Sequence, residues 1–111
     1  MRSLAMLLLA LPCLAACGGP LAEGESQFKK GQYPQAKQTF ASLESQSRSY
    51  PDGPRAEYAL YRGLTLSALG DRAQAGMWLR EAKAIADTNP GSLEHEDALR
   101  LKEAIEANEA P

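Results

Sequence analysis

The feature that most constrains this chain is an internal repeat with a period of 39 residues. Shifting the sequence by that distance aligns apolar residues, glycines and a proline with residues of the same type. The aligned pairs are Leu21 and Leu60, Gly24 and Gly63, Gly31 and Gly70, Gln35 and Gln74, Ala36 and Ala75, and Pro51 and Pro90. We therefore expect one structural unit to occur twice and to share a core between its copies.

The second copy has the clearest pattern. It predicts two helices, over residues 54–69 and 72–86, joined by Gly70 and Asp71. Apolar residues between Tyr58 and Leu69 lie on nearly all sides of the first of these helices, which indicates that it is the central one. Asp71 is a suitable N-cap for the second helix, with Gln74 three residues later as in a capping box.

The first copy predicts a helix over residues 20–30, a break at Gly31, and a second helix that begins at Pro34 and continues to about residue 46. Polar residues over 47–53 predict the loop between the copies. A last helix, expected over 92–108 with Ser92 as its N-cap, has one apolar and one strongly charged face. Such a helix is suited to end a repeat array in water.

These residues resemble the tetratricopeptide repeats (TPR). The first copy supplies Gly24, Gly31, Tyr33, Ala36, Phe40, Leu43 and Pro51, and the second supplies Gly63, Gly70, Ala75, Leu79, Ala82 and Pro90. The chain departs from the family pattern in its period of 39 instead of 34, in the large Leu43 where a small residue is usual, and in Arg72 where an aromatic is usual. The resemblance implies an all-α fold of antiparallel hairpins, with repeats over 20–53 and 54–91 and a capping helix over 92–108.

The N-terminus is predicted to be a cleaved signal peptide over residues 1–16. Arg2 is followed by the apolar run 4–11, which is too short to span a bilayer. The sequence Leu14-Ala15-Ala16-Cys17 resembles the lipobox of bacterial lipoproteins. That resemblance implies a diacylglyceryl group on the Cys17 thiol and a further acyl chain, such as palmitate, on its new amino terminus, with 17–19 as the linker. An ordinary signal peptide with an incidental cysteine is the alternative.

The processed chain would retain one cysteine, so helix packing rather than an internal disulfide must stabilise it. It would carry 11 basic and 14 acidic residues, a balance that gives no reason to expect nucleic acid as a partner. Gly18 follows Cys17, where enterobacterial lipoproteins retained in the inner membrane usually have Asp. We therefore expect the periplasmic face of the outer membrane.

The TPR resemblance also implies a peptide-binding groove lined by the first helix of each hairpin and by the capping helix. Such a groove suits an amphipathic helix or an extended peptide. The alternative is that its leucines are simply core residues. The candidate groove residues are Leu21, Glu25, Phe28, Glu57, Leu60, Tyr61, Leu64, Leu99, Arg100 and Glu103.

No pattern of catalytic residues is found in the sequence. The single histidine, His95, lies among acidic neighbours that point in different directions on a helix, so we predict no metal site and no enzymatic activity. Apart from the covalent lipid, no cofactor is expected. Trp78 lies off the apolar stripe of its helix. It either packs under the inter-repeat loop or the last helix, or is an exposed anchor for a partner.

The function expected from these features is that of a membrane-anchored TPR adaptor or scaffold that binds another envelope protein. The alternative is a structural subunit that self-associates, or that stabilises a larger outer-membrane, secretion or pilus complex. Two and a half repeats bury little surface, and about three are usually needed for a stable array, so this alternative stays open.

Overall fold

The computed structural model describes residues 19–111, and within this range the chain forms six α-helices and no strand. The predicted signal peptide and Cys17 lie outside the described residues. No helix within residues 19–111 has the length and apolarity needed to cross a bilayer. The helices are α1 (Gly19–Lys29), α2 (Tyr33–Ser42), α3 (Glu44–Ser47), α4 (Asp52–Ala68), α5 (Arg72–Thr88) and α6 (His95–Glu109).

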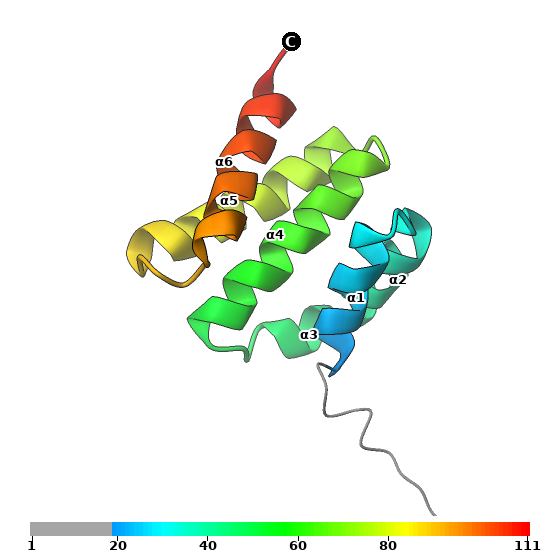
Figure 1. Cartoon of the computed structure of the whole chain (residues 1–111), viewed down its shortest axis with the longest axis horizontal. Helices are drawn as coiled ribbons and strands as arrows, with labels where there is room; N and C mark the ends of the chain where they lie inside the picture. Colours follow the sequence, from blue (N-terminus) through cyan, green and yellow to red (C-terminus); the bar gives the residue numbers. More distant parts are fainter. Residues whose placement is uncertain (1–18) are drawn as a thin grey trace, which may run out of the picture.

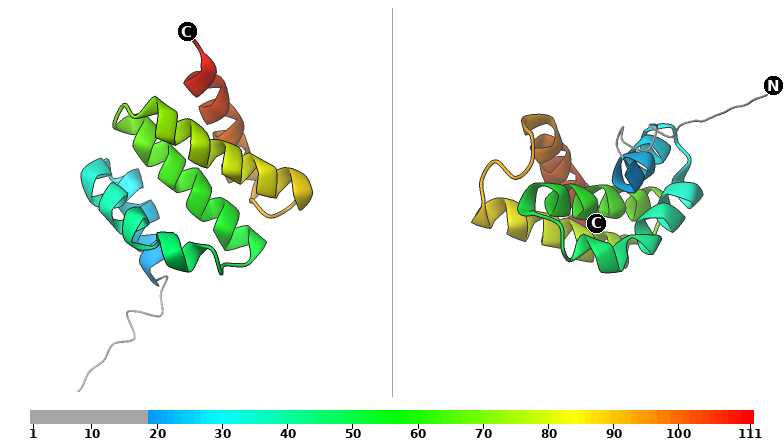
Figure 2. Two further views of the ribbon diagram at one scale, coloured as in Figure 1. Left: turned by 180° about the vertical axis from the view of Figure 1, so that it is seen from behind. Right: turned by 90° about the horizontal axis from the view of Figure 1, so that it is seen from below.

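The helices form two layers of antiparallel hairpins (Figure 1). α1 pairs with α2 and α4 pairs with α5, while α6 packs against both helices of the second hairpin. Figure 2 shows α1 and α6 rising on the same side of α4, with α5 and α3 on the opposite side. The predicted all-helical hairpin architecture is therefore confirmed.

α4 is the central helix, as its all-round apolar pattern predicts. It packs against α1, α2, α5 and α6, and eight of its residues are buried. Tyr58 makes an edge-on aromatic contact with Phe40 of α2, with ring centroids 5.9 Å apart, and its hydroxyl donates a hydrogen bond to the Phe40 carbonyl at 2.6 Å. Because one helix is in contact with both hairpins, the two repeats share a single core.

The 39-residue repeat of the sequence is matched by equivalent contacts in the two hairpins. A Cβ atom built on Gly24 would lie 2.6 Å from the Phe40 ring, and one built on Gly63 would lie 2.8 Å from Leu79. Both glycines therefore let the two helices of their hairpin approach closely, and both large partners are also 39 residues apart. The turns repeat as well, since Gly31 and Gly70 have φ values of 77° and 86°, which glycine adopts without the strain that other residues incur.

Two predicted boundaries are wrong. The helix expected from Pro34 to about residue 46 ends at Ser42, and a separate short helix follows, because Leu43 turns inward with φ −95° and ψ 0° and is buried. Ser92 does not cap the last helix: Glu94 holds the N-cap position without a side-chain hydrogen bond, and the Ser92 hydroxyl is buried without a partner. The chain first buries Leu93 in the core and only then starts α6.

Side chains beside the turn at Gly70 hold the N-terminus of α5 and the C-terminus of α6. The predicted cap is confirmed, because the Asp71 carboxylate accepts a hydrogen bond from the Gln74 backbone N–H at 3.1 Å. Arg72, which departs from the repeat pattern, donates hydrogen bonds to the Asn108 and Ala110 carbonyls at the end of α6. This departure therefore ties α5 to the last helix.

We predict that Gly63→Ala lowers the free energy of unfolding by about 1–2 kcal/mol, because its methyl group would clash with Leu79. Overpacking costs about 1–3 kcal/mol, and the better helix propensity of alanine recovers up to about 1 kcal/mol of it. Urea unfolding followed by circular dichroism measures the change. Gly53→Ala in the same helix is the control, since its Cβ meets only the Ser92 carbonyl oxygen at 3.4 Å. Equal effects of the two substitutions would contradict the role of close packing.

Candidate interaction surface

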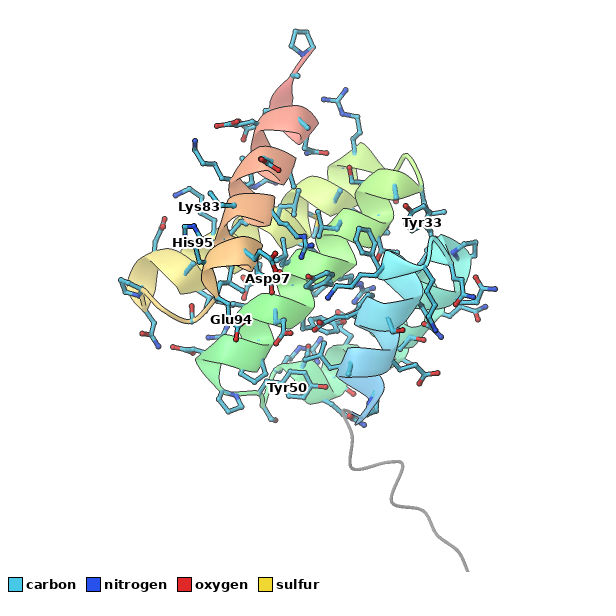
Figure 3. All side chains as sticks on the ribbon, viewed as in Figure 1. Tyr33, Tyr50, Lys83, Glu94, His95 and Asp97 are labelled. Carbon is cyan, nitrogen blue, oxygen red and sulfur yellow. The ribbon has the colours of Figure 1, made fainter. Side chains whose placement is uncertain are left out.

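The candidate site lies where α1, α4 and α6 face one another. Its polar residues come from all three helices, and we call this surface the α1–α4–α6 face. Figure 3 shows Asp97 directed from α6 toward α4, whereas His95 and Lys83 lie on the outer side of α6. The residues that define the face are Glu25 and Lys29 of α1, Glu57 and Tyr61 of α4, and Asp97 and Arg100 of α6.

Tyr61 connects the three helices of this face. Its hydroxyl donates a hydrogen bond to the Asp97 carboxylate at 2.7 Å and accepts one from Arg100 at 2.9 Å. Phe28 of α1 contacts the ring edge-on at a centroid distance of 5.7 Å, and the Lys29 ammonium lies 5.5 Å from the ring centroid. Because burial and the Asp97 carboxylate both disfavour the phenolate, the pKa of Tyr61 is raised above its ordinary value. The phenol thus stays a neutral hydrogen-bond donor.

Two carboxyl groups lie close together beside Tyr61. Glu25 of α1 is half-buried and shares a hydrogen bond with Glu57 of α4. Burial, followed by this hydrogen bond and the charge of Glu57, raises the pKa of Glu25 to about 8; Asp97 adds to the effect and Lys29 opposes it. Among the described residues neither Glu25 nor Glu57 has an ion-pair partner within 4.0 Å. The protonated form of Glu25 is therefore favoured beside Glu57.

The predicted groove residues divide into core and surface. Leu60 and Tyr61 are buried, and Leu21, Phe28 and Leu64 pack against the core while partly exposed. Leu99 is 47% exposed and Glu103 is exposed on α6. The intermediate positions are Glu25, Glu57 and Arg100. The apolar floor expected from the sequence is therefore only partly present: two of its members belong to the core, and four keep exposed apolar surface beside the polar groups.

Sequence reasoning missed two members of this face, Lys29 and Asp97. A signal for Asp97 was present, because it lies three residues before Arg100 and their side chains form an ion pair at 3.2 Å. Asp97 also stands 39 residues after the buried Tyr58, at a repeat position that faces inward. No local pattern singles out Lys29, whose role depends on a ring contributed by another helix.

Trp78 belongs to a second cluster, on the opposite layer. The Arg62 guanidinium lies 4.6 Å from the centroid of its ring, and Tyr58 packs edge-on against it at 5.6 Å. Arg62 also donates hydrogen bonds at 2.8 Å to Glu44 and to the Tyr58 hydroxyl. The sequence left open whether Trp78 packs against the domain or is an exposed anchor, and its contacts agree better with packing. They come from Arg62 and Tyr58 of α4, and Arg62 in turn binds Glu44 of α3.

A hollow of about 340 Å³ adjoins this cluster. It lies where α3, α4 and α5 meet, and charged and aromatic side chains line it together. The lining residues are Glu44, Ser47, Arg48, Arg55, Tyr58, Ala59, Met77, Trp78 and Glu81. Two arginines and two glutamates leave this hollow without an excess of either charge.

Metal ligation has no basis in the described part of the chain, where no three His, Cys, Asp or Glu residues are grouped to hold an ion. His95 is exposed and lies on the outer side of α6 (Figure 3).

No family model, curated protein or solved structure matches the chain. On the α1–α4–α6 face, three separate helices bring interacting polar groups together.

We predict that wild-type stability falls as pH rises from about 5 to 8, because the folded protein holds a proton on Glu25 that the unfolded chain releases near pH 4.5. Since the carboxyl is about half exposed, solvent screening reduces the effect to on the order of 1 kcal/mol. Glu25→Gln should flatten this pH profile and should be more stable than the wild type at pH 8. Urea midpoints between pH 4 and 9 measure it, and an unchanged profile in the variant would contradict the assignment.

Proposed function

We propose that this protein is a lipid-anchored helical adaptor of the TPR type in the bacterial envelope, and that it binds another envelope protein through the α1–α4–α6 face. The single observation that supports this best is the pair formed by Glu25 of α1 and Glu57 of α4, two partly buried carboxyl groups from different helices that have no ion-pair partner among the described residues. Pairs of this kind are costly, and a binding partner can relieve the cost.

The chemistry of the face favours a partner with a basic side chain. A lysine or arginine placed between Glu25 and Glu57 would displace the proton of Glu25 and form charge-assisted hydrogen bonds to both carboxylates. Arg100 and Lys29 at the edges would repel additional cations and so favour one basic residue over a strongly basic segment. Recognition of a protein segment in this way requires no catalytic group.

The anchor part of the proposal rests on the sequence. Leu14-Ala15-Ala16-Cys17 matches the lipobox, and only Gly18 separates Cys17 from the start of α1 at Gly19. A lipid on Cys17 would therefore hold the helical domain close to the membrane surface. Two or three acyl chains give effectively permanent attachment, because each buried methylene contributes about 0.8 kcal/mol.

We predict that Cys17→Ser releases the protein from membranes. Radiolabelled palmitate should be incorporated into the wild type and not into the variant, since serine offers no thiol for the diacylglyceryl group. Membrane fractionation with and without detergent measures the distribution. Cys13→Ser is the matched control and should remain anchored. Membrane attachment of Cys17→Ser equal to that of the wild type would contradict the lipid anchor.

We predict that a photo-crosslinking residue at Glu103 captures one specific envelope protein in living cells, whereas the same residue at Ala73 does not. Both positions are exposed, but Glu103 belongs to the predicted groove and Ala73 lies on α5 in the opposite layer. The Glu103 adduct should weaken at least tenfold when Glu25 and Glu57 are both replaced by glutamine.

Two outcomes would contradict the proposal: equal capture from Glu103 and Ala73, or an adduct that the double glutamine variant leaves unchanged. The double variant removes the negative charge but keeps the shape of both side chains. Circular dichroism establishes that it is folded, so a loss of capture reports on recognition and not on unfolding.

A further inference from the structure

The second hairpin shows how one helix, α5, covers the side of α4 that faces away from α1 and α6. α5 packs along α4, and its stripe of Ala75, Leu79 and Ala82 is fully or almost fully buried. Leu79 sits against Gly63, and Trp78 is held by Arg62 and Tyr58. The position that α5 occupies against α3 and α4 is called the α5 seat.

The 39-residue register predicts a second copy of this seat, and the structure contains it. Residues of α3 and α4 that line the first hollow correspond to residues of α5 and α6 that line another hollow, of about 350 Å³. The corresponding pairs are Glu44 and Lys83, Ser47 and Ala86, Arg48 and Asp87, and Ala59 and Ala98. The two hollows are therefore equivalent positions in successive repeats.

The two positions differ in what covers them. Met77, Trp78 and Glu81 of α5 border the first hollow, whereas no helix within residues 19–111 covers the second. Ala98 shows the effect: it lines the second hollow and is exposed, while its repeat equivalent Ala59, which lines the first, is buried. A face built to receive a helix is thus left open to solvent.

The second hollow, which we call the open seat, has an apolar floor between two edges that carry no net charge. The floor consists of Ala86, Ala98, Leu101 and Ile105. One edge carries the ion pair of Lys83 and Asp87, at 2.6 Å, and the other carries that of Lys102 and Glu106, at 3.7 Å. The small alanines permit close approach of a helix, and the balanced edges attract neither a strongly acidic nor a strongly basic ligand.

We infer that the open seat between α5 and α6 binds one amphipathic helix of a partner protein, whose apolar stripe has the small–large–small spacing of Ala75, Leu79 and Ala82. Lys102 stands where α4 has Gly63, so this helix lies further from α6 than α5 lies from α4, and its large apolar residue packs on the aliphatic stem of Lys102. The interaction is independent of the α1–α4–α6 face, which lies on the other side of α6.

A second copy of this chain is a poorer occupant. Within residues 19–111 the required spacing occurs on α4, as Ala56, Leu60 and Gly63, and on α5, and each stripe is already buried in the core. To offer either stripe, the copy would have to open its own central hairpin and expose the core that both repeats share. A helix from another protein carries no such cost.

The sequence of α5 supplies the probe for a test. A fluorescent peptide with residues 71–89, kept helical by a lactam bridge between Lys83 and Asp87, is titrated with the full-length protein in detergent micelles, and the anisotropy in empty micelles is subtracted. The bridge is needed because isolated helices of this length are marginal in water. A peptide with the same residues in shuffled order is the ligand control.

The protein variants are Ala98→Arg and Ala107→Arg. Both alanines are exposed on α6, but only Ala98 lines the open seat, and Ala107 is half a helical turn away around the axis. We expect saturable binding that Ala98→Arg weakens at least tenfold and Ala107→Arg changes less than twofold. Thermal melts followed by circular dichroism check that both variants fold.

Three results would overturn the inference: no saturable binding of the helical peptide, equal binding of the shuffled peptide, or equal losses in the two variants. Sedimentation of the wild type gives a fourth. A dimer that Ala98→Arg converts to a monomer would identify a second copy as the occupant. None of these results bears on capture from Glu103, so the adaptor proposal can fail or stand separately.

Discussion

The close approach of α4 and α5 is the constraint on which the rest of the molecule depends. With hydrogen in place of a side chain at Gly63, Leu79 can sit against the α4 backbone, and Gly24 gives Phe40 the same space in the first hairpin. α4 then lies deep enough to be covered on several sides at once. From that position it contacts α2 through Tyr58 and α6 through Tyr61.

Much of this fold could be predicted because the information is local and occurs twice. Helical periodicity, the turn glycines and the Asp71 cap are encoded within a few residues, and each copy supports the interpretation of the other. The errors lie where distant packing decides. Leu43 breaks a helix in order to bury its side chain, and Leu93 delays the start of α6 for the same reason. Neither outcome can be read from the propensities of neighbouring residues.

The candidate site was harder to predict, although the helix positions led to the right helices. Glu25, Glu57 and Arg100 were found, but as the acidic or basic edges of an apolar groove. Their actual chemistry depends on pairings between distant segments, such as Tyr61 with Asp97 and Glu25 with Glu57, and on how far burial perturbs each group. Sequence periodicity assigns a residue to a face of its helix, but it does not specify the depth at which that face is covered.

Tyr61 has a mechanical consequence for the whole domain. Its ring is in contact with α1 and its hydroxyl is bonded to α6, so the two outer helices are joined through one side chain of the central helix. A force applied at the N-terminal end of α1 would reach α6 along this path without passing through α2 or α5. The orientation of α6 on α4 is therefore coupled to that of α1 through the side chain of Tyr61.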